Sequence, residues 1–151
     1  MANDTSADAI SIALASDHAG YRAKEAIERD LRRRGYRVQD FGTDSEAPVD
    51  YPDFVRPAAE SVAGNENHLG IVFGGSGNGE AMVANKVKGI RCAVCWSRES
   101  ARLAKAHNNA NMISIGARMV SESEIIGIVE TWLDESFEGG RHIQRIRKME
   151  P

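Results

Sequence analysis

Short apolar runs alternate with segments of helical periodicity along almost the entire chain. Five runs rich in β-branched and apolar residues are typical of buried strands: 10–16, 36–41, 69–73, 90–96 and 112–116. Helical spacing follows each run, over residues 21–34, 53–63, 80–87, 97–106 and 121–132. This order predicts an α/β fold, a doubly wound parallel sheet of about five strands with helices on both faces, as in Rossmann-like or flavodoxin-like three-layer sandwiches.

Composition narrows the class of protein. The chain has 151 residues and a net charge of −3, which fits one domain and argues against a general nucleic-acid binder. It contains no apolar run of about 20 residues, so no membrane partner is expected. Two cysteines do not form a disulfide framework, which favours the cytoplasm. We expect residues 1–9 to be a flexible tail, and residues 10–151 to form a single domain that ends in a basic helix over 141–148.

The strongest functional signal is the segment Gly74-Gly75-Ser76-Gly77-Asn78-Gly79-Glu80, which follows an apolar strand and opens a helix. It lacks the Gly-Lys-Ser/Thr of a P-loop and the G-x-G-x-x-G spacing of a dinucleotide fingerprint. Its glycine density favours an anion cradle over a ligand-free tight turn. Glu80 is then either a base beside developing negative charge or a first-turn acid that complements the helix dipole.

Other polar groups fall at positions where ligands bind in such folds. Asp17-His18 follows the first strand and Arg118 the fifth, so both lie at carboxyl ends of parallel strands. His107-Asn108 follows a helix and reads either as a polar turn or as a catalytic pair. Arg141 and Arg145 share a helix face, as a phosphate clamp or as a solvated basic tail.

Cys92 and Cys95 have the spacing of a C-x-x-C pair. On a strand, positions i and i+3 point to opposite faces. We therefore interpret both as core thiols rather than as a redox or zinc pair.

Taken together, eight ordered motifs resemble the type B ribose-5-phosphate isomerase family, which also contains galactose- and allose-6-phosphate isomerases. The resemblance covers nearly all of the chain beyond residue 9. The motifs are Ser16-Asp17-His18-Ala19-Gly20, Asp50-Tyr51-Pro52, the glycine segment through Glu80, Ala84-Asn85-Lys86, Gly89-Ile90-Arg91, His107-Asn108-Asn109-Ala110-Asn111, Gly116-Ala117-Arg118, and Gly139-Gly140-Arg141-His142 with Gln144-Arg145.

The resemblance implies an aldose–ketose isomerase that works through an enediolate without a metal or other cofactor. Many members carry a cysteine base at the position of Gly74, and this chain resembles the subgroup in which a glutamate, here Glu80, replaces it. His107 matches the ring-opening histidine, and Asp17 lies in the site to assist. Asn108 matches a group that holds a sugar hydroxyl. Phosphate binding is implied for His18, Arg118, Arg141 and Arg145.

The physical chemistry of the glycine segment agrees with this role. Charge that builds on a substrate oxygen needs donors already aimed at it, and the amides of Gly75, Gly77, Asn78 and Gly79, with the Ser76 hydroxyl, supply them. The resemblance also implies a homodimer or tetramer whose active sites are shared between subunits.

Two readings compete with ribose 5-phosphate isomerisation. The same chemistry on allose 6-phosphate, galactose 6-phosphate or a tetrose phosphate stays open, because the loop over residues 41–51 sets substrate length in a way that sequence does not reveal. A non-catalytic phosphate-binding module needs the loop and the arginines, but it does not need Glu80, His107 and Asp17 together. A redox or zinc protein built on Cys92 and Cys95 is a more distant alternative.

Overall fold

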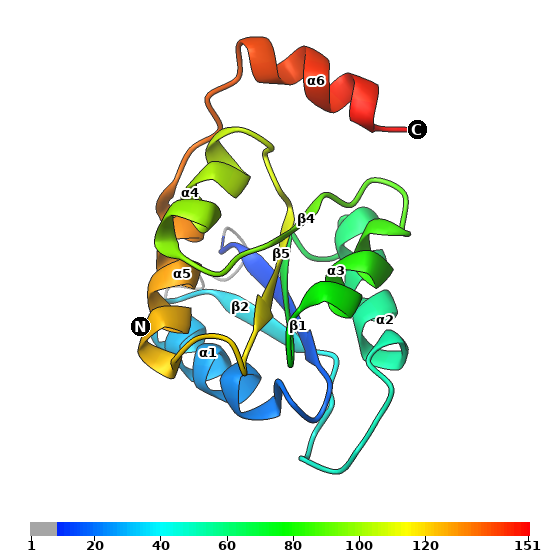
Figure 1. The fold of residues 1–151 in the computed structure, drawn as a ribbon, viewed down its shortest axis with the longest axis vertical. Helices are drawn as coiled ribbons and strands as arrows, with labels where there is room; N and C mark the ends of the chain where they lie inside the picture. The colour runs from blue at the N-terminus through cyan, green and yellow to red at the C-terminus, as the bar shows by residue number, and fades with distance from the viewer. Residues whose placement is uncertain (1–8) are drawn as a thin grey trace, which may run out of the picture.

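A computed structural model describes residues 9–151, and its core is one five-stranded sheet (Figure 1). All neighbouring strands are parallel, in the order β2-β1-β3-β5-β4. The strands are β1 (Ser11–Ser16), β2 (Arg37–Asp40), β3 (Leu69–Gly74), β4 (Cys92–Val94) and β5 (Met112–Gly116). The helices are α1 (Tyr21–Arg33), α2 (Pro52–Ala63), α3 (Asn78–Asn85), α4 (Arg98–Ala106), α5 (Glu122–Asp134) and α6 (Arg141–Met149). The predicted doubly wound α/β fold is confirmed.

Helices cover both faces of the sheet because successive strand residues point to opposite sides. In β1, Ile12 and Leu14 pack in a cluster with α1, α4 and α5, whereas Ala13 and Ala15 pack with α2 and α3. Figure 1 shows these two helical layers on either side of the strands. The α6 helix lies beyond one end of the sheet, outside both layers.

The edge strand β4 is shorter than the predicted run over residues 90–96. Side chains take the place of strand partners where it begins. The Arg91 amide donates to Asn111 Oδ1 over 2.8 Å, and the Asn85 amide group bonds both the N–H and the C=O of Cys92. Cys92 and Cys95 belong to the clusters on opposite faces of the sheet, which confirms that they are core thiols rather than a pair.

Two further boundaries matter for the site. The α3 helix begins at Asn78, before the predicted start at Glu80, because Gly77 adopts a left-handed conformation (φ 82°) that ends the loop as the N-cap. The predicted basic helix forms as α6. The predicted tail, residues 1–9, lies outside the described residues except for Ala9, and no helix within 9–151 is long and apolar enough to cross a membrane.

Candidate active site

The order in which strands are added to the sheet reverses between β1 and β3, so the carboxyl ends of these two strands form the topological switch point of the fold. From β1 the chain passes outward to β2, whereas from β3 it passes the other way toward β4 and β5. Ser16 pairs with Phe73 in register, so Asp17 and Gly74 leave these neighbouring strands side by side. Ligands of doubly wound folds bind in the crevice at such a point.

Asp17 is held at the carboxyl ends of β1 and β3 by the turn that starts α1. Its carboxylate Oδ1 accepts the Gly20 amide over 3.1 Å, and its own amide lies 3.4 Å from the Phe73 carbonyl. A Cβ on Gly20 would lie 2.5 Å from the Phe73 carbonyl group, so only glycine lets this turn pack against β3. The aspartate is therefore fixed beside the end of β3.

The carbonyl groups of the glycine loop tie it to β5, which leaves the amides of Gly75, Ser76 and Gly77 available. Gly74 and Gly75 accept the amides of Ala117 and Arg118, and Gly77 accepts the Ser114 hydroxyl over 2.7 Å. Within residues 9–151, no acceptor bonds the amides of Gly75, Ser76 or Gly77. These N–H groups stand before the first turn of α3, where a helix attracts negative charge.

The side chains of Ser76 and Asn78 complete the loop. Ser76 Oγ accepts the Asn78 amide over 3.2 Å, so the hydroxyl proton of Ser76 remains free to donate.

Gly79 faces the ring of Tyr51, since a Cβ there would lie 2.5 Å from the Tyr51 hydroxyl. Tyr51 thus packs against the start of α3. The sequence did not predict this contact, although Tyr51 is part of the Asp50-Tyr51-Pro52 motif.

Glu80 occupies the space that a side chain at position 74 would fill. A Cβ built on Gly74 overlaps the Glu80 carboxylate, and Glu80 is only 3% exposed. The first turn of α3 directs this side chain inward, toward the end of β3. Gly74 therefore leaves room for the carboxylate beside the end of β3.

The protonation of Glu80 is shifted by this placement. Burial raises the pKa of its carboxyl, the nearby Asp17 carboxylate raises it further, and a hydrogen bond from its own backbone amide opposes the rise. A raised pKa brings a carboxylate closer to the range in which it both takes up and returns a proton. The Glu80 carboxyl beside the glycine loop thus has the raised pKa that is expected of a general base.

His18 and Arg118 lie at the same end of the sheet. His18 Nδ1 accepts the Val49 amide over 3.1 Å, which ties the loop between β2 and α2 to the end of β1. Arg118 is exposed, and its side chain runs past Gly75. The structure thus brings together Asp17, His18, Glu80, the glycine loop and Arg118, and we call this set the carboxyl-end cluster.

The remaining predicted site residues lie at the other end of the sheet. His107 follows α4, which returns toward the amino ends of the strands, and Asn108 leads toward β5. Arg141 and Arg145 are exposed on α6, which Figure 1 shows beyond that same end. We call these four residues the amino-end cluster. A six-residue strand spans about 20 Å, longer than a five-carbon sugar phosphate, so one chain does not bring the two clusters to one substrate.

Two residues beside His107 were not predicted as functional. The rings of His107 and His142 stack with centroids 4.3 Å apart, and the Glu138 carboxylate lies 3.7 Å from His107 Nε2. His142 stood in the Gly139-Gly140-Arg141-His142 motif, but Glu138 carried no signal, because its place depends on the path of the chain between α5 and α6.

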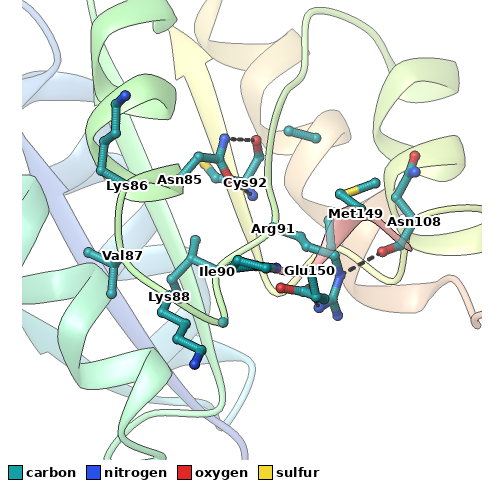
Figure 2. Close-up of a pocket in the computed structure, with 14 residues that line it drawn as sticks. Asn85, Lys86, Val87, Lys88, Ile90, Arg91, Cys92, Asn108, Met149 and Glu150 are labelled. Atoms are coloured by element: carbon teal, nitrogen blue, oxygen red, sulfur yellow. Dashed lines mark hydrogen bonds and ion pairs between the residues drawn. The ribbon is translucent and has the colours of Figure 1, made fainter. Parts of the chain in front are cut away.

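A cavity of about 500 Å³ lies at this amino end, between the start of β4 and the end of α6. Figure 2 shows Arg91 reaching across it toward Asn108. Arg91 Nε donates to the Asn108 carbonyl over 3.0 Å and Nη1 to Glu150 over 2.5 Å, which fastens the end of α6 to the sheet layer. Asn108 is the only predicted site residue in the lining, so this cavity is separate from the carboxyl-end cluster around Glu80.

Comparisons with known proteins place these observations in one family. A family described as "Ribose/Galactose Isomerase" matches residues 12–149 of this chain. Ribose-5-phosphate isomerase B of Mycolicibacterium paratuberculosis is 45% identical over 135 residues, which cover 88% of this chain and 85% of that protein.

Solved structures similar to this chain come from the same family. Ribose-5-phosphate isomerase B of Clostridium thermocellum superposes with a TM-score of 0.92 at 46% identity, covering 93% of this chain and 95% of that one. The Mycoplasma genitalium enzyme with bound ribulose-5-phosphate superposes with a TM-score of 0.89 at 42% identity, covering 93% of each chain.

Proposed function

The chain belongs to the ribose/galactose isomerase family, and we propose that it interconverts ribose 5-phosphate and ribulose 5-phosphate through an enediolate. The names of its relatives support this substrate, as does the structure of one of them with bound ribulose-5-phosphate. The observation that carries the mechanism is the buried carboxylate of Glu80 beside the free amides of the glycine loop.

In this proposal Glu80 moves the proton between two carbons. Its carboxylate takes the proton from C2 of the open-chain aldose, the C–H electron pair forms the C1–C2 double bond, and the carbonyl pair moves onto O1. The amides of Gly75 and Gly77, with the Ser76 hydroxyl, stabilise the charge on oxygen. The O2 hydroxyl proton of the enediolate then passes to O1, and Glu80 returns the carbon-bound proton to C1 as the O2 electron pair forms the C2 carbonyl, which gives the ketose with no net loss or gain of protons.

Ring opening and phosphate binding are assigned to the remaining groups. His107 acts as the acid/base that opens the furanose ring, assisted by Asp17, while Asn108 holds a hydroxyl. His18 and Arg118 from one chain, with Arg141 and Arg145, bind the phosphate. Because His107 and the α6 arginines lie at the opposite end of the sheet from Glu80, we infer that a second copy supplies them, in a homodimer or tetramer.

Two features favour this assembly and its compartment. Trp96 and Met119 are 64% and 70% exposed just after the carboxyl ends of β4 and β5, where a second copy would cover apolar surface. Cys92 and Cys95 are free, buried thiols, which fits the reducing cytoplasm.

The proposal is tested by turnover of ribose 5-phosphate beside allose 6-phosphate, galactose 6-phosphate and a tetrose phosphate, for wild type and Glu80→Gln. We expect the pentose to be converted, and kcat of Glu80→Gln to fall by about 10²–10⁴ with sugar-phosphate affinity kept, because only the base is lost. Glu99→Gln removes the same charge from an exposed site and is the matched control. A Glu80→Gln enzyme that retained most of its kcat would refute the base.

The shared site has its own test. Glu80→Gln and His107→Asn chains are each inactive alone, but a mixed dimer has one site with both residues intact. Mixing the two variants is expected to restore roughly a quarter of wild-type activity, because random exchange makes half the dimers mixed and each carries one working site. Failure of the mixture to gain activity, although subunits exchange, would place both residues in the site of one chain.

A further inference from the structure

Arg91 stands in the Gly89-Ile90-Arg91 motif, to which the proposed function assigns no role. Its main chain is bonded to the segment that leads into β5. The Asn111 side chain accepts the Arg91 amide over 2.8 Å and donates to the Gly89 carbonyl over 2.9 Å. The Met112 amide lies 3.3 Å from the Arg91 carbonyl. The backbone of Arg91 is therefore fixed at the amino end of β5.

The guanidinium of Arg91 binds two successive carbonyl groups beyond the end of α4. Its Nε donates to the Asn108 carbonyl over 3.0 Å, a bond that Figure 2 shows, and its Nη2 donates to the Asn109 carbonyl over 2.8 Å. Asn109 has a left-handed backbone (φ 44°), which residues other than glycine seldom adopt. A cation at this end of a helix is also favoured by the helix dipole. The guanidinium thus holds the turn that directly follows His107.

The third contact of the same guanidinium is with the end of α6. Its Nη1 donates to the Glu150 carboxylate over 2.5 Å, one residue beyond the last turn of this helix. The only buried residue of α6 is His142, so the core does little to orient the helix. The pair of Arg91 and Glu150 therefore fixes the far end of the helix that carries two arginines of the amino-end cluster.

These three acceptors explain why an arginine stands at position 91. A guanidinium presents five N–H groups in a rigid plane, whereas the ammonium of a lysine is a compact charge that does not span three separated acceptors. The Arg91 side chain is only 18% exposed, so its ion pair with Glu150 is shielded from water more than an ordinary surface pair.

We propose that Arg91 is the positioning residue of the amino-end cluster. Its guanidinium holds the turn that carries His107 and Asn108, and the helix that carries Arg141 and Arg145, in one fixed arrangement. The inference rests on the proposed function, in which these four groups act on one sugar phosphate. Arg91 acts through them and not on the substrate. A displacement of catalytic groups by about 1 Å lowers the rate by about 10².

The contacts of Arg91 divide into two arms with different kinetic consequences. We call the bonds to the carbonyl groups of Asn108 and Asn109 the loop arm, and the bond to Glu150 the helix arm. The loop arm places the ring-opening group, so its loss is expected to lower kcat on sugars that form rings. The helix arm places the phosphate-binding arginines, so its loss is expected to raise KM on every sugar phosphate.

Arg91→Lys weakens both arms while it keeps the positive charge and the apolar stem. We expect kcat for ribose 5-phosphate to fall by about 10², whereas a tetrose 4-phosphate, which does not close a furanose ring, keeps most of its kcat. Arg32→Lys is the matched control, because Arg32 also bonds a glutamate, Glu28, and a backbone carbonyl, that of Val38. An equal change of kcat on both sugars would mean that Arg91 only supports the fold, and would overturn the positioning role.

Glu150→Ala removes the helix arm alone. The Glu150 side chain is 30% exposed and lies beyond the last turn of α6, so the core is not disturbed. We expect KM to rise about tenfold on both sugars with kcat nearly unchanged, which is at the lower end of the loss of one charge-assisted hydrogen bond. Glu60→Ala removes the same charge from an exposed position of α2 and is the control. A lower kcat at unchanged KM would overturn the helix arm.

The placement of His107 is measured without any sugar by ¹H NMR of the four histidine rings. The rings of His107 and His142 stack with centroids 4.3 Å apart, so each shifts the proton signals of the other. We expect these two sets of signals to move in Arg91→Lys, while those of His18 and His68 stay in place. Unchanged His107 and His142 signals would overturn the positioning role. If the wild-type protein converts none of the sugars, the isomerase assignment fails, whereas the NMR signals still decide whether Arg91 places His107.

Discussion

The two ends of the sheet carry functional groups in opposite ways. At the carboxyl end, the Glu80 carboxylate is buried and the glycine loop is held by backbone bonds to β5. At the amino end, Asn108, Arg141 and Arg145 are exposed, and α6 stands outside the helical layers. Asp17 and Glu80 of the first cluster are thus buried, whereas Asn108, Arg141 and Arg145 of the second belong to the periphery.

This difference indicates a division of labour. A proton carrier needs an altered pKa, which requires burial, and burial comes from the sheet and its covering helices. Phosphate binding needs accessible cations, which a peripheral helix presents more readily than a core does. In our proposal, the chain therefore builds the proton transfer between carbons into its own core and presents Arg141 and Arg145 outward, toward a second copy.

Among the tests of this division, His107→Asn has the largest expected effect on kcat. In our proposal it removes ring opening and lowers kcat for ribose 5-phosphate by about 10²–10⁴. A tetrose 4-phosphate has its O4 esterified and cannot close a furanose ring, so its turnover should be affected far less. Steady-state kinetics on both sugars measures the ratio. An equal loss on both would mean that the amino-end cluster takes part in the chemical step.

Gly74→Ala tests the core side of the comparison. The new Cβ overlaps the Glu80 carboxylate and moves it, and a displacement of about 1 Å is expected to lower kcat by about 10². Gly35→Ala is a control for glycine loss, because a Cβ there meets nothing within 4 Å, although its positive φ of 93° adds local strain. Retained kcat in Gly74→Ala would show that the position of Glu80 is not critical.

Arg145→Ala tests the periphery. We expect KM to rise by about 10–100-fold with kcat nearly unchanged, since a charge-assisted hydrogen bond contributes about 1.5–3 kcal/mol. Arg147→Ala removes the same charge from another exposed position of α6 and serves as the control. A lowered kcat at unchanged KM would contradict a role in phosphate binding.

The smallest effect concerns stability. Because burial raises the pKa of Glu80, the protonated form favours folding. The stability that the folded state gains from protonated Glu80 is fully present at pH values below the unfolded-state pKa, and it is lost as the pH rises through the folded-state pKa. Glu80→Gln stays neutral, so its free energy of unfolding is expected to exceed that of wild type at pH 7, with the gap closing on acidification. Urea denaturation at several pH values measures it, with Glu99→Gln as the control that shows no gain.

Sequence patterns predicted the sheet and the carboxyl-end cluster because both depend on local features. Strand periodicity, the glycine loop and the order of Asp17 and Arg118 after their strands are readable one segment at a time. The short β4 was not predictable, because its start is set by side chains of Asn85 and Asn111 from other segments. The amino-end grouping of His107 with Glu138 likewise depends on where the chain between α5 and α6 passes.

The shared space of Gly74 and Glu80 constrains how this site changes over evolution. A chain with this fold has either a side chain at position 74 or a carboxylate from position 80 in that space. In our proposal, adding the cysteine that the resemblance implies for many members of the family at position 74 creates a clash while Glu80 remains, and removing Glu80 first leaves no base. Each single substitution therefore gives a poorly active enzyme. Evolution from one kind of base to the other thus requires both substitutions together.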